Sequence, residues 1–233
     1  MQLKKLEAAL VKFREFLPTK AAQERLYIWE SQLLFQQNWD QDAADFSAMF
    51  DRSLDNSQTR RLWKRERFEP KRMMLLFLGE EPDFVRSMFI DLFNPDKSVE
   101  NRVDRFVFYC DELLSRYKRK YPLSIENNHY HQDYEMIALY LAFRYPEVYA
   151  CYDAEAFRTT LALLSAPNVP VGHDLPRHFK VCKTIFTFML KDEELMERHR
   201  ARLEEGKHYM GNSYLLSYDF MCFCRAAGEK LFD

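Results

Sequence analysis

The sequence predicts an all-α protein: an irregular multi-helix bundle of about ten helices with no significant sheet. Three observations support this fold class. Apolar side chains recur three and four residues apart along most of the chain, which places them on one face of a helix. The 233 residues include only 5 glycines and few β-branched runs, which disfavours a turn-rich β-sandwich or barrel. Prolines and capping residues stand at the ends of the periodic stretches.

The clearest helix follows a stop at Asn94-Pro95. Proline cannot continue a helix, and it forces the preceding residue out of the α region. Ser98 is then a candidate N-cap. The apolar face of this helix consists of Val99, Val103, Phe106, Val107, Cys110, Leu113 and Leu114. These spacings predict a helix from Ser98 to Leu114.

The other predicted helices follow from the same periodicity and the same stop signals. Thr19 is the candidate cap of the second helix, and Gly79 is a candidate C-terminal stop. The expected helices are residues 3–17, 19–38, 42–54, 72–78, 82–93, 131–144, 153–164, 175–190, 192–205 and 213–227. Residues 116–128 and 166–174 are expected to be loops, the second because of its two prolines and one glycine.

A change in composition suggests where the chain divides. Residues 55–58 are polar, and residues 60–72 (RRLWKRERFEPKR, the basic segment below) are dominated by Lys and Arg. We therefore predict an amino-terminal helical subdomain at residues 1–58 and a main helical domain at residues 59–233, or alternatively one continuous domain.

Overall composition narrows the class of protein. The chain is 47% hydrophobic and 30% charged, so it can bury a substantial core. A net charge of −2 excludes a polycation that coats nucleic acid, although a local basic patch remains open. The 5 cysteines show no C-x-x-C spacing and indicate reduced thiols. No signal peptide and no stretch long enough to span a membrane is recognised, so we expect a cytoplasmic protein without a membrane partner.

The sequence offers little chemistry. No phosphate-binding, dinucleotide-binding, zinc-protease or nucleophile-elbow motif is present, so we expect no catalytic residue, no cofactor and no enzymatic activity of this chain alone. His129 and His131, followed by Asp133 and Glu135, could suggest a metal site. His131 and Glu135 would share a helix face, but Asp133 does not join them there, and no third ligand at a favourable spacing is evident. A solvated helix start with acids near its positive end explains these residues equally well, and we predict no metal.

The basic segment is the candidate nucleic-acid interface. Its cations could bind phosphates, and Trp63 could stack on a base. The predicted binding residues are Arg60, Arg61, Trp63, Lys64, Arg65, Arg67, Lys71 and Arg72. The competing interpretation is a solvated linker whose aromatic residues pack into the core. Arg116 to Lys120, in the predicted loop, could extend the same surface.

Three stretches carry a resemblance to a known family. The first combines Leu92-Phe93 and Asp96 with Asn101-Arg102-Val103 and Phe106. The second is IALYLAFRYPEVY at residues 137–149, followed by Tyr152 and Phe157, and the third is YLLSYDF at residues 214–220. Together, over residues 73–223, they resemble the helical region ahead of the motor in McrB-like AAA+ proteins of modification-dependent restriction systems.

The resemblance implies a helical accessory domain that works with an AAA+ motor and a nuclease subunit, commonly in recognition of modified DNA. The motor with its phosphate-binding loop is absent from this sequence, and no catalytic residue can be transferred. We therefore expect a recognition or targeting domain of an antiviral restriction system that contacts DNA. The alternative is a protein-interaction module that docks on a motor or effector subunit, which the high aromatic content would suit.

Overall fold

The computed structural model describes residues 1–55 and 69–232, and within these ranges it is entirely helical, with no strand. The helices are α1 (Leu3–Phe16), α2 (Lys20–Gln23), α3 (Tyr27–Asn38), α4 (Phe46–Ser53), α5 (Glu69–Glu80), α6 (Pro82–Leu92), α7 (Val99–Lys120), α8 (Glu135–Arg144), α9 (Ala154–Leu163), α10 (Leu175–Met189), α11 (Glu193–Ala201), α12 (Leu215–Ala227) and the 3₁₀ helix η1 (Gly228–Phe232). The predicted all-α fold is confirmed. Among the described residues, no helix is both long enough and apolar enough to cross a bilayer.

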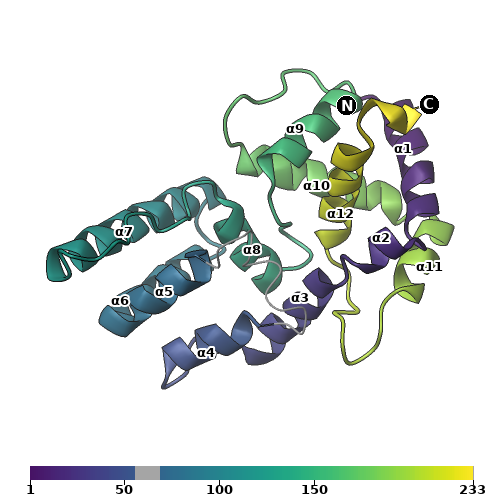
Figure 1. The fold of residues 1–233 in the computed structure, drawn as a ribbon. Helices are drawn as coiled ribbons and strands as arrows, with labels where there is room; N and C mark the ends of the chain where they lie inside the picture. Colours follow the sequence, from purple (N-terminus) through teal and green to yellow (C-terminus); the bar gives the residue numbers. More distant parts are fainter. Residues whose placement is uncertain (56–68, 233) are drawn as a thin grey trace.

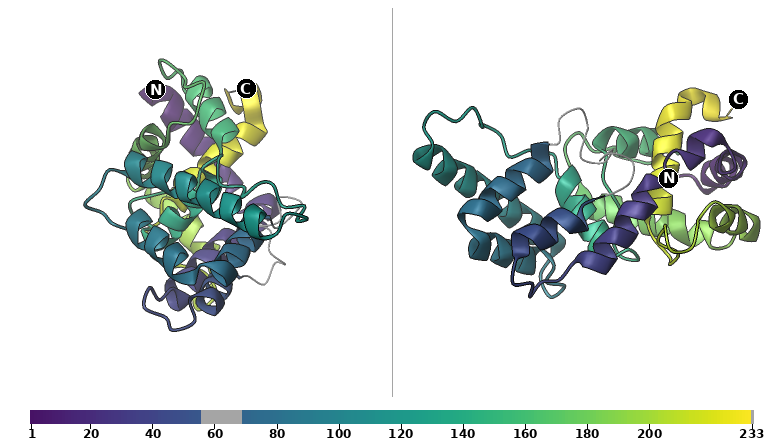
Figure 2. Two further views of the ribbon diagram at one scale, coloured as in Figure 1. Left: turned by 90° about the vertical axis from the view of Figure 1, so that its left-hand side faces the viewer. Right: turned by 60° about the horizontal axis from the view of Figure 1, so that its bottom comes forward.

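The helices gather at two ends of an elongated molecule (Figure 1). Helices α4 to α7 lie at one end, and α1, α2 and α9 to α12 lie at the other, with α3 and α8 between them; the two further views agree (Figure 2). One buried apolar cluster runs through both ends, from Leu6 to Leu231. The boundary predicted between residues 58 and 59 falls between α4 and α5, which pack on each other, and α1 packs on α12.

Several helix starts are fixed by the capping side chains that the sequence suggested. Ser98 accepts a hydrogen bond from the backbone N–H of Asn101 at the start of α7, and Thr19 accepts one from Ala22 at the start of α2. Asp153 caps α9 in the same way. Each cap satisfies a backbone donor that the first helical turn leaves without a partner.

Several predicted helix limits are wrong; among them, the helix expected from residue 42 begins at Phe46 as α4, and the helix expected to reach residue 205 ends at Ala201 as α11. The helix predicted to stop at Leu114 continues to Lys120, because Tyr117 still packs on the core and cations favour the last turn of a helix. The helix predicted over residues 19–38 is divided into α2 and α3. Gly79 lies inside α5 instead of ending it. The helix predicted from His131 begins only at Glu135.

An aromatic cluster joins the central helices to the α4–α7 end. Phe89 of α6 lies at its centre, with its ring centroid 5.1 Å from that of Trp39 and 5.2 Å from those of Phe106 and Tyr140. Side chains of this size contribute the most apolar area that a helix can bury, and offset or edge-to-face pairs add to it. This cluster fixes the relative positions of α6, α7 and α8, which carry or flank the sites described next.

Candidate nucleic-acid interface and a buried cysteine–histidine cluster

Most of the predicted nucleic-acid-binding residues lie outside the described part of the chain. This applies to Arg60, Arg61, Trp63, Lys64, Arg65 and Arg67. The structure places the last two members of the set, Lys71 and Arg72, in the first turns of α5. The contacts of Lys71 and Arg72 therefore show how the carboxyl-terminal end of the basic segment is attached to the helices around it.

Lys71 is engaged inside the protein. Its side chain crosses to the end of α4, where Nζ donates hydrogen bonds to the backbone oxygens of Asp51 at 2.9 Å and Leu54 at 3.1 Å. Nζ also lies 2.7 Å from Oδ1 of Asp51, and Lys71 is 5% exposed. A lysine that binds the last carbonyls of a helix acts as a C-terminal cap. Lys71 thus holds the end of α4 against the start of α5 and has no donor facing outward for a phosphate.

Arg72 lies at the surface, but acids surround it. Its Nη2 is 2.7 Å from a carboxylate oxygen of Glu69 and 2.6 Å from one of Glu126, while 44% of its side chain remains exposed. Any phosphate that approaches Arg72 competes with these two carboxylates. Arg72 therefore links the start of α5 to the connection of residues 121–134 between α7 and α8, called the α7–α8 loop below.

The second basic run does not lie beside Arg72. It forms the last turns of α7, where Arg116 pairs with Glu81 at 2.8 Å and Lys120 pairs with Glu80. Glu80 is the last residue of α5, so this end of α7 lies roughly 12 Å along the α5 axis from Arg72. The predicted extension of the basic surface is therefore interrupted by acids in the described structure.

The α7–α8 loop exposes two large apolar side chains close to Arg72. Leu123 is 98% exposed and Ile125 is 89% exposed, and Glu126, the ion-pair partner of Arg72, follows directly. Single exposed apolar residues are common on protein surfaces, but two on one short segment form a small apolar patch. The α7–α8 loop thus combines the charge of Glu126 with apolar contact area.

A buried cluster of Cys110, His129 and His131 lies where this loop returns to α7. All three residues are 0% exposed, and one potential ligand atom from each lies within 4.8 Å of the other two. Nε2 of His129 is 3.0 Å from Oδ1 of Asp111. Nδ1 of His131 is 2.5 Å from the backbone oxygen of His129.

Burial sets the protonation of this cluster. It lowers the pKa of His131 to about 3, with the neighbouring His129 acting in the same direction. Burial also lowers the pKa of His129, against the opposing effect of Asp111. The pKa of the Cys110 thiol is raised well above its usual value, first by burial and then by Asp111. At neutral pH both imidazoles are therefore neutral and present nitrogen lone pairs.

Sequence reasoning found the two histidines but missed the third donor. Glu135 was expected to share a helix face with His131, but α8 begins at Glu135 and His131 precedes it. The donor that completes the set is Cys110, which the apolar periodicity of α7 marked only as a core residue. Its distance along the chain from the histidines follows no standard ligand spacing, so no sequence signal identified it.

The remaining cysteines are free and buried, which fits the prediction of reduced thiols. Cys182 is the nearest parallel to Cys110, because its Sγ lies 3.5 Å from Nε2 of His178. Burial raises its pKa well above the usual value, as it does for Cys110. A thiol that stays protonated is a poor nucleophile, so neither arrangement favours cysteine catalysis.

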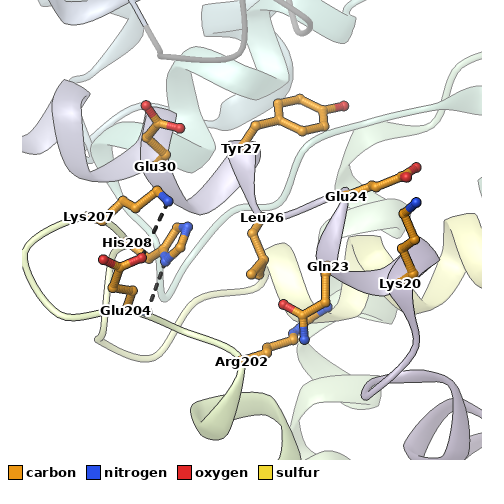
Figure 3. A pocket seen from close by; sticks show the side chains of 10 residues that line it. All are labelled: Lys20, Gln23, Glu24, Leu26, Tyr27, Glu30, Arg202, Glu204, Lys207 and His208. Atoms are coloured by element: carbon orange, nitrogen blue, oxygen red, sulfur yellow. Dashed lines mark hydrogen bonds and ion pairs between the residues drawn. The ribbon is translucent and has the colours of Figure 1, made fainter.

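A surface pocket of about 440 Å³ lies at the other end of the molecule, between α2, α3 and the turn after α11 (Figure 3). Its wall carries both signs of charge, and much of that charge is internally matched. Glu204 pairs with Lys207 at 3.3 Å, and its backbone N–H donates to Nδ1 of His208 at 2.9 Å. Arg202 is held by the buried Asp219 at 2.8 Å. This arrangement gives no acid–base pair aimed at a common point.

Comparisons of the chain with protein-family models, with curated proteins and with solved structures found no match. The fold and the two sites above are therefore the observations on which a function is argued.

Proposed function

We propose that this chain is a non-catalytic recognition module that contacts DNA through the basic segment, as part of a modification-dependent restriction system with an AAA+ motor and a nuclease. The resemblance to the helical region of McrB-like proteins supports the setting. The DNA contact is supported by the charge of residues 60–72 and by the way the fold holds the ends of this segment.

The observation that carries the proposal is the contact made by Lys71. Its ammonium group bonds to Leu54, so the described chain before the basic segment and the described chain after it meet at one point. The described chain thus ends at residue 55 and resumes at residue 69 with α4 and α5 packed on each other. Clustered cations on one site give a local attraction for phosphates even when the whole chain carries a net charge of −2.

The test measures affinity for labelled duplexes that are plain, methylated or hydroxymethylated, at two salt concentrations. We expect binding that weakens with salt, with a slope of about −0.9 in log K for each phosphate contacted. The triple variant Arg61→Glu, Lys64→Glu and Arg65→Glu should reduce that slope by about three contacts. A preference among the three duplexes would identify the modification that is read.

A matched control reverses three exposed lysines away from the basic segment. Lys4 lies on α1, and Lys180 and Lys183 lie on α10. Their replacement by Glu changes the net charge as much as the first variant does, and it should leave most of the binding intact. Equal losses in the two triple variants, or no binding of the unmodified chain at low salt, would refute the assignment of the basic segment.

The exposed side chains of Leu123 and Ile125 favour a second candidate function, docking on a protein such as the motor subunit. The double variant Leu123→Ser and Ile125→Ser removes this apolar surface without touching the core. If docking is the function, the variant loses affinity for the purified motor subunit and keeps its affinity for DNA. An unchanged affinity for the motor subunit would refute docking through this loop.

A further inference from the structure

We infer that Cys110, His129 and His131 form a binding site for a divalent transition-metal ion of the zinc type, which fastens the α7–α8 loop to α7. The inference does not depend on DNA binding. It rests on the donor set, the geometry of the two imidazoles, the backbone that presents them and the charge around them.

The donor set is one that zinc prefers. Zinc in proteins takes cysteine sulfur at about 2.3 Å and histidine nitrogen at about 2.0–2.1 Å in a tetrahedral arrangement, which puts neighbouring ligand atoms roughly 3.5 Å apart. The three donors already lie within 4.8 Å of one another. A contraction of roughly 1 Å would bring them to bonding geometry, which is a side-chain adjustment.

The second partners of the imidazoles resemble those of metal-bound histidines. A ligating histidine donates its other ring N–H to a carboxylate or a backbone carbonyl, which fixes the ring and its tautomer. His131 makes such a bond from Nδ1 to the backbone oxygen of His129, and His129 makes one from Nε2 to Asp111. The nitrogens left for an ion are Nε2 of His131 and Nδ1 of His129, and an ion would have to displace the hydrogen bond that each of them now makes.

In their present positions both of these nitrogens are engaged in hydrogen bonds within the protein. Nε2 of His131 is 3.2 Å from the hydroxyl of the buried Tyr140, and Nδ1 of His129 is 3.2 Å from the backbone nitrogen of His131. An ion that bound both nitrogens and the Cys110 sulfur would replace these contacts. The fourth tetrahedral position would fall to an oxygen, and the Tyr140 hydroxyl is the nearest protein candidate.

The backbone of the loop is held in an unfavourable conformation around the histidines. Tyr130 has a φ of 60° and Tyr134 a φ of 63°, the left-handed region that a side chain with a Cβ atom rarely adopts. The turn at Tyr130 lies between His129 and His131 and lets both imidazoles reach α7. Strain of this kind persists where surrounding interactions fix it, and a bound ion would supply such an interaction.

The local charge also suits a cation. The carboxylates of Asp111 and Asp133 both act on His129. A bound ion favours the thiolate form of a cysteine ligand, so binding would release a proton from Cys110. The competing interpretation is a buried histidine pair that is complete without an ion.

The experiment uses the whole chain, purified under reducing conditions. We expect about one zinc ion per chain by elemental analysis. After chelation, added Co²⁺ should give the visible bands of tetrahedral cobalt together with a near-ultraviolet thiolate-to-cobalt band, and Zn²⁺ should displace it. This measurement needs no variant, and its failure on the unmodified chain would overturn the inference.

Two variants identify the ligands. Cys110→Ala should abolish the thiolate band, whereas Cys182→Ala should keep it, since Cys182 is equally buried but neighbours a single histidine, His178. Asp111→Asn, at an exposed residue that is safe to change, should weaken zinc binding by about 10–100-fold. A thiolate band that survives in Cys110→Ala, or equal losses in both cysteine variants, would refute the site.

Discussion

Replacement of Asp219 by Asn tests the strongest electrostatic feature of the fold. Asp219 lies on α12 with 0% exposure, and its carboxylate binds Arg202 at 2.8 Å and also Arg25. Arg202 in turn lies over the ring of Trp29, 4.8 Å from its centroid. One buried carboxylate thus connects α12 with the junction of α2 and α3 and with the end of α11.

The expected effect is large because Asn keeps the shape of the side chain but removes its charge and replaces one of its two acceptor oxygens by an NH2 donor facing a guanidinium group. Loss of one partner from a buried ion pair leaves an uncompensated charge and costs about 3–5 kcal/mol of unfolding free energy. For a chain of 233 residues that corresponds to a fall in Tm of roughly 6–20 °C. Glu194→Gln is the matched control: its side chain is 50% exposed and pairs with Arg14 and Arg198, so we expect about 0–1 kcal/mol.

Urea unfolding followed by circular dichroism measures both variants, and acid adds a second test. Burial tends to raise the pKa of Asp219, but Arg25 and Arg202 outweigh it, so the folded pKa is lowered. The stabilisation is therefore present above the unfolded pKa of about 3.9 and is lost as pH falls through the folded value. The Asn variant should show less additional loss below about pH 4. A cost for Asp219→Asn no larger than that of Glu194→Gln would refute the reasoning.

Three further outcomes are expected. Lys71→Met should cost about 1–3 kcal/mol in urea unfolding, because the buried oxygen of Leu54 loses its lysine donor and Asp51 loses its ion pair; a change near zero would show that Lys71 acts as a surface cation. Asp153→Ala should lose both the cap of α9, worth about 0.5–2 kcal/mol, and the ion pair with Arg225, whereas Asp153→Asn should lose the ion pair and keep the cap, so Ala should cost more than Asn in urea unfolding. Burial lowers the pKa of His178 to about 4 and of His199 to about 3. Below pH 6.5 these two histidines are therefore protonated in the unfolded chain and remain neutral in the folded chain. As the pH is lowered below 6.5, the unfolding free energy should fall by about 1.4 kcal/mol for each pH unit and each histidine. A urea midpoint that is the same at pH 7 and pH 5 would contradict this.

The helices could be predicted from sequence where a local signal sets them. Ser98 caps α7 and Thr19 caps α2 because a cap involves residues only three apart. The end of α7 could not be found this way, because the sequence after Leu114 is polar and the contact of Tyr117 with the core depends on α5 and α6. Periodicity reports which residues face inward, and it does not report how long a helix remains supported by its neighbours.

In the candidate sites, too, the sequence shows the local pattern but not the tertiary contacts. The charge of the basic segment is visible in the sequence, but the inward direction of Lys71 depends on two carbonyls at the end of α4. Cys110 was correctly placed on the buried face of α7, yet its proximity to His129 and His131 arises only when the α7–α8 loop folds back. Local patterns identify chemical groups, whereas tertiary contacts decide which groups meet.

The α7–α8 loop connects the two proposals physically. It carries the apolar pair Leu123 and Ile125, it supplies Glu126 to Arg72, and it ends at His129 and His131. An ion that held the histidines to α7 would also hold Glu126 in place, and Glu126 keeps Arg72 partly neutralised. Removal of the ion would then loosen that pair and leave Arg72 freer to meet a phosphate. If both proposals hold, chelation should strengthen DNA binding at low salt in the unmodified chain. It should leave DNA binding unchanged in Glu126→Gln, where the link between Arg72 and the α7–α8 loop is already gone and only Glu69 still pairs with Arg72.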